Sequence, residues 1–156
     1  MDYIRNHWYV AGFASEFGEA FTTATILEED IVLYRIADGS VVAFDDRCPH
    51  RALPLSMGKR IGDQLQCGYH GLTFGTDGQC VRVPGQRSGP PQAWVRKYPT
   101  HERHGIVWIW RGAAEAAEIG HGAGLRIGMH YYAILREQAG VTGDFGDFLV
   151  ALLHGT

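Results

Sequence analysis

Residues 48–70 read Cys-Pro-His-Arg-Ala-Leu-Pro-Leu-Ser-Met-Gly-Lys-Arg-Ile-Gly-Asp-Gln-Leu-Gln-Cys-Gly-Tyr-His, and this stretch decides the fold. It opens with the pair Cys48 and His50 and closes with the pair Cys67 and His70. The sixteen residues between His50 and Cys67 are enough for a hairpin that returns the second pair beside the first. Two thiolates and two imidazoles gathered at one point suit either a tetrahedral Zn²⁺ ion or a two-iron cluster.

The order of the four ligands favours the cluster over zinc. The common zinc finger places both cysteines in one pair and both histidines in the other, whereas each pair here is mixed. A [2Fe–2S] cluster with two cysteines on one iron and two histidines on the other is the Rieske arrangement. Mixed pairs let each loop supply one ligand to each iron. We therefore expect a Rieske-type cluster and keep structural zinc as the alternative.

The chain around these pairs is predicted to consist of short strands. Ile31–Tyr34 and Val41–Phe44 are β-branched and aromatic runs, and the Asp-Gly of Ala37–Ser40 between them is a strong hairpin signal. Ile106–Trp110 is apolar at every position, as expected of a strand that is buried on both faces. Helical periodicity is nearly absent before residue 112. We predict an all-β fold, with antiparallel sheets packed as a sandwich or a small barrel.

Three further structural expectations concern single segments or side chains. Ser56–Gly62 carries two glycines and two basic residues, which is typical of a loop. Cys80 lies on a strand-like run and is expected to be a small buried hydrophobic residue and not a ligand. The four tryptophans are expected in the core: Trp8, Trp94, Trp108 and Trp110.

Composition excludes several classes of protein. The chain has 156 residues, of which 46% are hydrophobic and 20% charged, so it is globular and not disordered. A net charge of −3 without any long run of lysine or arginine argues against a nucleic-acid partner. No apolar run approaches the roughly 20 residues that cross a bilayer, and no secretory signal opens the chain. We therefore expect a cytoplasmic protein without a disulfide framework, in which metal binding is the better interpretation of the cysteines that have histidines nearby.

More than the four ligands resembles a known family. Cys48-Pro-His-Arg51 and Cys67-Gly-Tyr-His-Gly-Leu72 look like the two cluster motifs of Rieske non-haem iron oxygenases, most of all the vanillate O-demethylase and toluenesulfonate methyl-monooxygenase type. His7–Ala11, Val83–Gln86 and Gly105–Trp110 resemble flanking segments of the same family. The resemblance covers residues 3–111. It implies a cluster held by Cys48, His50, Cys67 and His70, with Val83–Gln86 as a covering loop.

A comparison within Rieske proteins narrows the class. The respiratory type carries an extra cysteine in each cluster loop, and the two form a disulfide. The matching positions in this chain are Leu53 and Tyr69, so that disulfide cannot form. The resemblance is therefore to the low-potential class.

The resemblance divides the chain into residues 1–111, a Rieske [2Fe–2S] domain, and residues 112–156, an incomplete or degraded start of an α+β oxygenase catalytic domain. Complete members hold a mononuclear Fe(II) there with two histidines and a carboxylate. Asp144, Asp147 and His154 do not have the required spacing, so we assign no catalytic residue. A truncated or frame-shifted gene product is the favoured explanation, and a natural short protein that kept only the Rieske module is the other.

The resemblance also implies a function. The cluster would receive electrons from a reductase or ferredoxin and pass them on within an aromatic-compound oxygenase, either a monooxygenase or demethylase or a ring hydroxylase. Such oxygenases commonly pass electrons between neighbouring subunits, so a homo-oligomer is expected. The alternative is a free-standing carrier of the Rieske ferredoxin type, which would have no substrate site.

Overall fold

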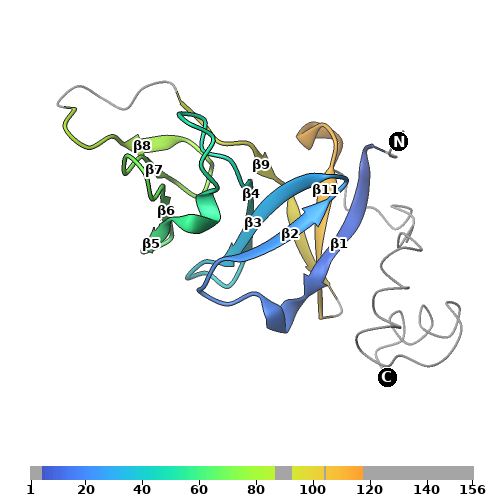
Figure 1. The fold of residues 1–156 in the computed structure, drawn as a ribbon. Helices are drawn as coiled ribbons and strands as arrows, with labels where there is room; N and C mark the ends of the chain where they lie inside the picture. The colour runs from blue at the N-terminus through green and yellow to red at the C-terminus, as the bar shows by residue number, and fades with distance from the viewer. Residues whose placement is uncertain (1–4, 87–92, 104, 118–156) are drawn as a thin grey trace, which may run out of the picture.

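The structure, a computed structural model, describes residues 5–86, 93–103 and 105–117, and all of its sheets are antiparallel (Figure 1). The strands are β1 (His7–Phe13), β2 (Thr22–Ile26), β3 (Glu29–Arg35), β4 (Val41–Asp45), β5 (Lys59–Ile61), β6 (Gln64–Gln66), β7 (Thr73–Phe74), β8 (Cys80–Arg82), β9 (Lys97–Tyr98), β10 (Thr100–Arg103) and β11 (Ile106–Arg111). Three short 3₁₀ helices connect them: η1 (Ala14–Glu16), η2 (Leu55–Met57) and η3 (Ala114–Ala116). The all-β prediction is confirmed. Over the described ranges, no helix is long and apolar enough to cross a membrane.

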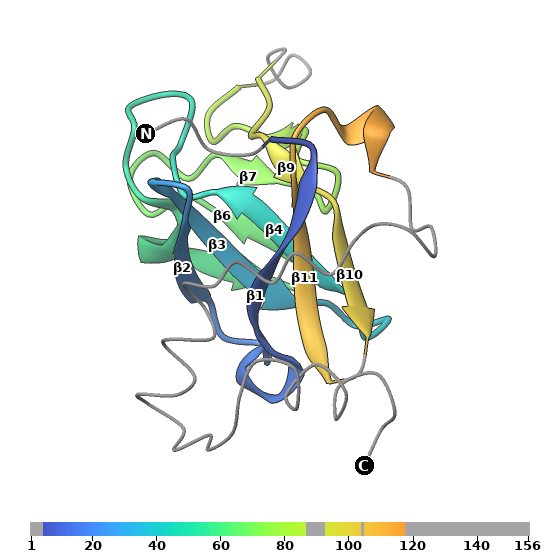
Figure 2. The ribbon, with the colours of Figure 1, turned by 90° about the vertical axis from the view of Figure 1, so that its right-hand side faces the viewer.

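Two of the sheets pack on each other as layers. One has the strand order β1-β11-β10, and the other has the order β2-β3-β4-β9. Figure 2 shows β1, β11 and β10 lying in front of β3 and β4. Leu33, Ala43, Tyr98, Val107 and Ile109 are all nearly inaccessible to solvent in the core between these layers. This pair of sheets is the rigid base of the molecule.

The third sheet, β5-β6-β7-β8, forms a smaller subdomain on the other face of β3 and β4 (Figure 1). Strand β3 has apolar side chains on both faces, which is why it can join the two parts. Ile31 and Leu33 enter the core toward β11, and the alternate residues Val32 and Tyr34 enter a second core with the third sheet. That second core also contains the two cysteines of the mixed pairs.

The structure corrects two of the local predictions. Ser56–Gly62 is not a loop, because Lys59–Ile61 forms β5 and pairs with Gln64–Gln66. Strand pairing there uses backbone groups, which composition does not reveal. Trp94 is 61% exposed and does not belong to the core, whereas Trp110 is buried. The predicted hairpin at Ala37–Ser40 is confirmed: β3 pairs with β4, and Gly39 occupies the turn with φ of 89°.

The segment after β11 is described only as far as Ala117. Most of the expected second domain, residues 112–156, therefore lies outside the described residues. The same holds for Asp144, Asp147 and His154, the side chains compared with a mononuclear iron site. The expected boundary at residues 111 and 112 stays a prediction.

Candidate metal centre

Two loops of matching backbone geometry carry the four expected ligands. In the first loop, the amide of Cys48 donates to the carbonyl oxygen of Leu53 at 2.9 Å. In the second loop, the amide of Cys67 donates to the carbonyl oxygen of Leu72 at 2.8 Å. Each bond spans five residues, and the residue before each acceptor has a positive φ, 56° at Ala52 and 73° at Gly71. The same cysteine-to-leucine hydrogen bond thus closes both loops, whose sequences share only that cysteine and that leucine at matching positions.

In space the two loops sort the expected ligands by type, so that thiol lies beside thiol and imidazole beside imidazole. The thiols of Cys48 and Cys67 are buried, at 2% and 3% exposure, and lie within hydrogen-bonding reach of each other. The imidazoles of His50 and His70 are exposed, and their ring centroids are 4.7 Å apart with the planes at 63°. Tyr69 lies over His70, with ring centroids 3.8 Å apart. Two sulfur donors therefore lie inside and two nitrogen donors outside.

The environment of the Cys48 thiol favours its neutral form in the absence of a cation. Burial raises the pKa of Cys48, and the neighbouring Cys67 thiol raises it further. The backbone amides of His50 and Arg51 act against this, because they donate to the sulfur of Cys48 and so lower that pKa. A bound metal would supply the positive charge that two adjacent thiolates need.

The pairing of donors by kind fits a binuclear centre. Among the described residues, no three histidine, cysteine, aspartate or glutamate side chains converge as the ligands of a single metal ion. A two-iron cluster requires only two protein ligands on each iron, because the irons are joined by sulfide. The buried sulfur pair and the exposed nitrogen pair match that division. Cys80 is buried at 4% exposure and its thiol donates to the carbonyl oxygen of Arg82 at 3.6 Å, so it lies outside this set, as predicted.

The base beneath the thiols is apolar. Leu55, Leu65, Leu72 and Phe74 are buried in the same core cluster as both cysteines. Leu65 and Phe74 are directly paired across β6 and β7. This packing excludes water from the inner side of the site, which strengthens the electrostatic effect of every nearby dipole.

A carboxylate clamp holds the first loop, and the sequence gives no signal for it. Asp46 accepts hydrogen bonds from the amide and from the hydroxyl group of Ser56, both at 2.6 Å. The clamp joins the end of β4 to η2 and encloses the loop that carries Cys48. Ten residues separate its partners, and an Asp and a Ser at that spacing match no sequence motif. Asp46 and Ser56 are therefore residues that sequence reasoning missed.

Close backbone contacts fix the second loop. A Cβ atom on Gly58 would lie 2.1 Å from the carbonyl oxygen of Gln66, the residue before Cys67. A Cβ atom on Gly68 would lie 2.8 Å from the carbonyl oxygen of Met57. Glycine is needed at both positions because the junction of η2 and β5, at Met57 and Gly58, passes directly against Gln66 and the loop that follows it.

The segment expected to cover the site lies against the second loop. A Cβ atom on Gly71 would meet Cγ of Pro84 at 2.8 Å. Gly85 has a φ of 77°, and the amide of Gln86 donates to the carbonyl oxygen of Val83 at 3.3 Å. Val83–Gln86 therefore forms a turn against Gly71, the residue after His70, and the continuation of this loop at residues 87–92 lies outside the described residues.

Comparison with known proteins identifies a family for more than half of the chain. The Rieske [2Fe-2S] domain family matches residues 7–99. The iron-sulfur subunit of the toluene-4-sulfonate monooxygenase system of Comamonas testosteroni is 46% identical over 111 residues, covering 70% of this chain and 32% of that protein. Dicamba monooxygenase bound to dicamba superposes with a TM-score of 0.73 at 43% identity, covering 78% of this chain and 36% of that one.

A third relative was solved together with a partner. The oxygenase in the oxygenase–ferredoxin complex of carbazole 1,9a-dioxygenase superposes with a TM-score of 0.64 at 31% identity. The match covers 69% of this chain and 29% of that one. The chain spans about a third of the length of the relatives it matches.

Proposed function

This chain belongs to the Rieske [2Fe-2S] domain family, and from that premise we propose that its two cysteine–histidine loops hold a [2Fe–2S] cluster which carries electrons within an aromatic-compound oxygenase. The main support for the proposal is that the sulfur and nitrogen donors are separated in space. Cys48 and Cys67 form a buried sulfur pair, and His50 and His70 form an exposed nitrogen pair. Two thiolates would ligate the inner iron and two neutral imidazoles the outer iron.

When bound, the cluster supplies a centre that accepts and releases one electron at a time. The chain sets the conditions for that exchange. The amides of His50 and Arg51 donate to the sulfur of Cys48 and stabilise negative charge there. The apolar base formed by Leu65, Leu72 and Phe74 keeps water from the sulfur side. The exposed imidazoles leave the outer side open to redox partners.

The wider assignment rests on the relatives. An iron-sulfur subunit of the toluene-4-sulfonate monooxygenase system and dicamba monooxygenase both match this domain. We infer an oxygenase component that receives electrons from a reductase or a ferredoxin, as the ferredoxin complex of the carbazole oxygenase illustrates. A complete member would pass them to a mononuclear Fe(II) that acts on an aromatic substrate. The family resemblance also favours a homo-oligomer, in which the acceptor iron belongs to a neighbouring subunit.

A cytoplasmic location fits the state of the cysteines. Cys48, Cys67 and Cys80 are free thiols, and a reducing compartment keeps thiols available as ligands. We therefore propose that the protein acquires its cluster and works in the cytoplasm.

The test is the spectrum of the purified chain together with its iron and sulfide content. After dithionite reduction, low-temperature EPR is expected to give the rhombic, low-average-g signal of a histidine-ligated [2Fe–2S] cluster. Cys48→Ser and His70→Ala are expected to abolish the signal and the bound iron. Cys80→Ser, which changes a buried thiol outside the ligand set, is the matched control and should retain both. A colourless protein that contains zinc would show that the pairs form a structural site instead.

A further inference from the structure

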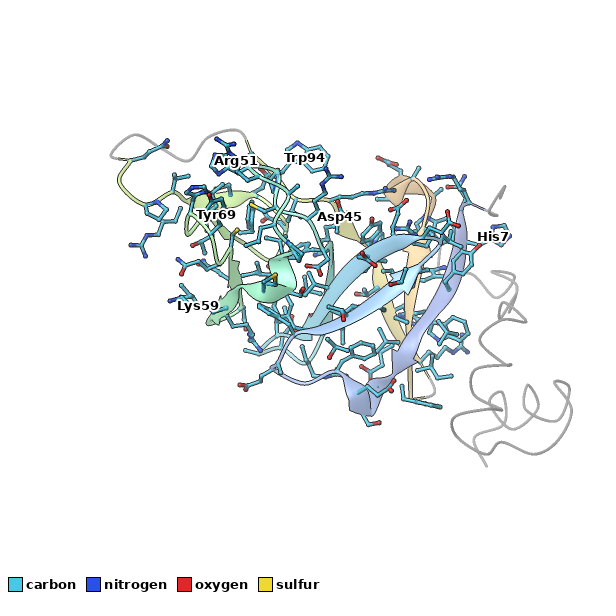
Figure 3. The ribbon with its side chains drawn as sticks, in the orientation of Figure 1. His7, Asp45, Arg51, Lys59, Tyr69 and Trp94 are labelled. Atoms are coloured by element: carbon cyan, nitrogen blue, oxygen red, sulfur yellow. The ribbon has the colours of Figure 1, made fainter. Side chains whose placement is uncertain are left out.

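A groove of about 520 Å³ opens beside the first ligand loop. The residues that matter in its lining are Asp45, Arg47, His50, Arg51, Trp94 and Arg96. Figure 3 shows Arg51 and Trp94 along the upper edge of the molecule, far from His7. His50 is the imidazole that faces this groove, and His70 is not among its lining residues. The groove therefore gives direct access to one side of the candidate metal centre.

The groove is positively charged although the chain as a whole is not. Three guanidinium groups line it, from Arg47, Arg51 and Arg96, against the single carboxylate of Asp45, while the net charge of the whole chain is −3. Arg96 is partly engaged, because it lies over the ring of Tyr98 and 3.5 Å from Glu29. Arg47 and Arg51 are exposed, and neither has an ion pair within the described part of the chain. Over the described ranges, Asp45 is the one groove carboxylate that interacts with Arg47, at longer range than an ion pair, so both guanidinium groups can pair with an external partner.

Trp94 adds an apolar contact to the charged rim. Its side chain is 61% exposed, which is unusual for a tryptophan. Its backbone is nonetheless fixed: Trp94 forms a β-bridge with Gln79, and the amide of the next residue, Val95, donates to the carbonyl oxygen of Gly78 at 2.9 Å. A rigidly held, exposed tryptophan beside arginines is the composition typical of the energetic centre of a protein–protein interface.

We propose that this groove docks an acidic electron-donor protein. Carboxylates of the donor would pair with Arg47 and Arg51, and an apolar side chain of the donor would pack on Trp94. In the complex the donor is oxidised by one electron and the cluster is reduced by one, with His50 as the nearest ligand to the donor. The inference rests on the proposed function and extends it by naming the docking surface and the charge of the partner.

The proposal is tested on the full-length, cluster-loaded chain with a defined probe, a plant-type acidic [2Fe–2S] ferredoxin. Binding is measured by calorimetry, and electron transfer from the reduced probe by stopped-flow absorbance, at several ionic strengths. We expect at least a tenfold weaker affinity for the R47E/R51E double variant and a clear loss for Trp94→Ala. The transfer rate of the unaltered chain is expected to fall as salt increases, and that of the double variant much less.

Lys59→Glu is the matched control for charge reversal. Lys59 is exposed on β5, and Figure 3 places it in the same subdomain well away from Arg51 and Trp94. It should bind the probe with nearly the affinity of the unaltered chain. Equal affinity for the unaltered chain and the double variant would overturn the proposal, as would an equal loss for Lys59→Glu or no saturable binding at low salt.

The docking proposal and the proposed function fail in distinguishable ways. The EPR signal measures the cluster content of every sample, so transfer rates are expressed per cluster. A chain without the signal refutes the electron-transfer function, whatever it binds. A chain with the signal and with the same affinity in all variants refutes only the groove as the docking surface. Preferential binding of the groove to RNA over the acidic ferredoxin would likewise refute the choice of partner.

Discussion

Gly58→Ala is the substitution for which the structure gives the sharpest expectation. Gly58 lies between η2 and β5 with φ of −87°, so an alanine there has no backbone strain. Its added Cβ, however, would lie 2.1 Å from the carbonyl oxygen of Gln66 and 2.9 Å from that of Leu55. Both obstacles are backbone atoms, which cannot rotate away as a side chain can. The effect of this substitution is therefore purely steric.

The magnitude follows from the distances. Real Cβ contacts are essentially never shorter than 3.0 Å, so the chain at Gly58 and the chain at Gln66 must separate by about 0.9 Å. Overpacking of this kind costs about 1–3 kcal/mol of unfolding free energy. Because Gln66 directly precedes Cys67, the shift also moves a proposed ligand. We expect Gly58→Ala to be less stable and to retain less iron per chain.

The assay is urea unfolding at neutral pH, combined with iron analysis and the EPR signal of the reduced protein. Gly18→Ala is the matched control, because no atom lies within 4 Å of a Cβ placed there and its φ is not positive. The control should keep the unfolding free energy and the iron content of the unaltered chain. Full stability and a full complement of iron in Gly58→Ala would refute the claim that the junction of η2 and β5 fixes the second ligand loop by direct backbone contact.

Three further predictions concern buried polar groups. Burial raises the pKa of Tyr34 to about 12 from 10.0, so the unfolding free energy is unaffected by this group below pH 10 and falls between pH 10 and 12, by up to about 2.7 kcal/mol. In urea unfolding, Tyr34→Phe should lose less stability at alkaline pH than the unaltered chain. Identical alkaline curves for the two proteins would contradict this. Glu29→Gln leaves the buried Arg111 without the carboxylate that it contacts at 2.6 Å, and should lower the unfolding free energy by about 3–5 kcal/mol. An unchanged midpoint in urea unfolding would show that this ion pair does not stabilise the fold. Ser56→Ala removes the hydroxyl that donates to Asp46 and should lower the unfolding free energy by about 1.5–3 kcal/mol, with faster bleaching of the cluster in urea. Ser56→Thr keeps the hydroxyl and should behave like the unaltered chain in both measurements.

The local predictions that succeeded depend on neighbours in the sequence. The hairpin at Ala37–Ser40 was predictable because an Asp-Gly turn between two β-branched runs selects its own geometry. The burial of Cys80 was predictable because it lies on a strand-like run beside Val81 and Val83. In both places the physical cause acts within a few residues, so the sequence displays it directly.

The local predictions that failed depend on distant partners. β5 is a strand because Lys59–Ile61 pairs with Gln64–Gln66 and starts in tight contact with the second ligand loop. Trp94 is exposed because the isolated bridge to Gln79 holds its backbone where the side chain lines the groove and does not enter a core. Neither cause has a counterpart in composition or periodicity.

The amino-acid sequence alone was enough to predict the donor set of two thiols and two imidazoles in mixed pairs, the family that such pairs indicate, and an all-β scaffold. Donor type and spacing are covalent properties of the chain, which is why they can be read without coordinates. Three features became visible only in the folded chain: the sulfurs are buried and the imidazoles exposed, Asp46 clamps the first loop, and one face beside His50 is basic and carries Trp94. These properties arise where segments far apart in sequence pack together, and burial and charge at such a place depend on all of them at once.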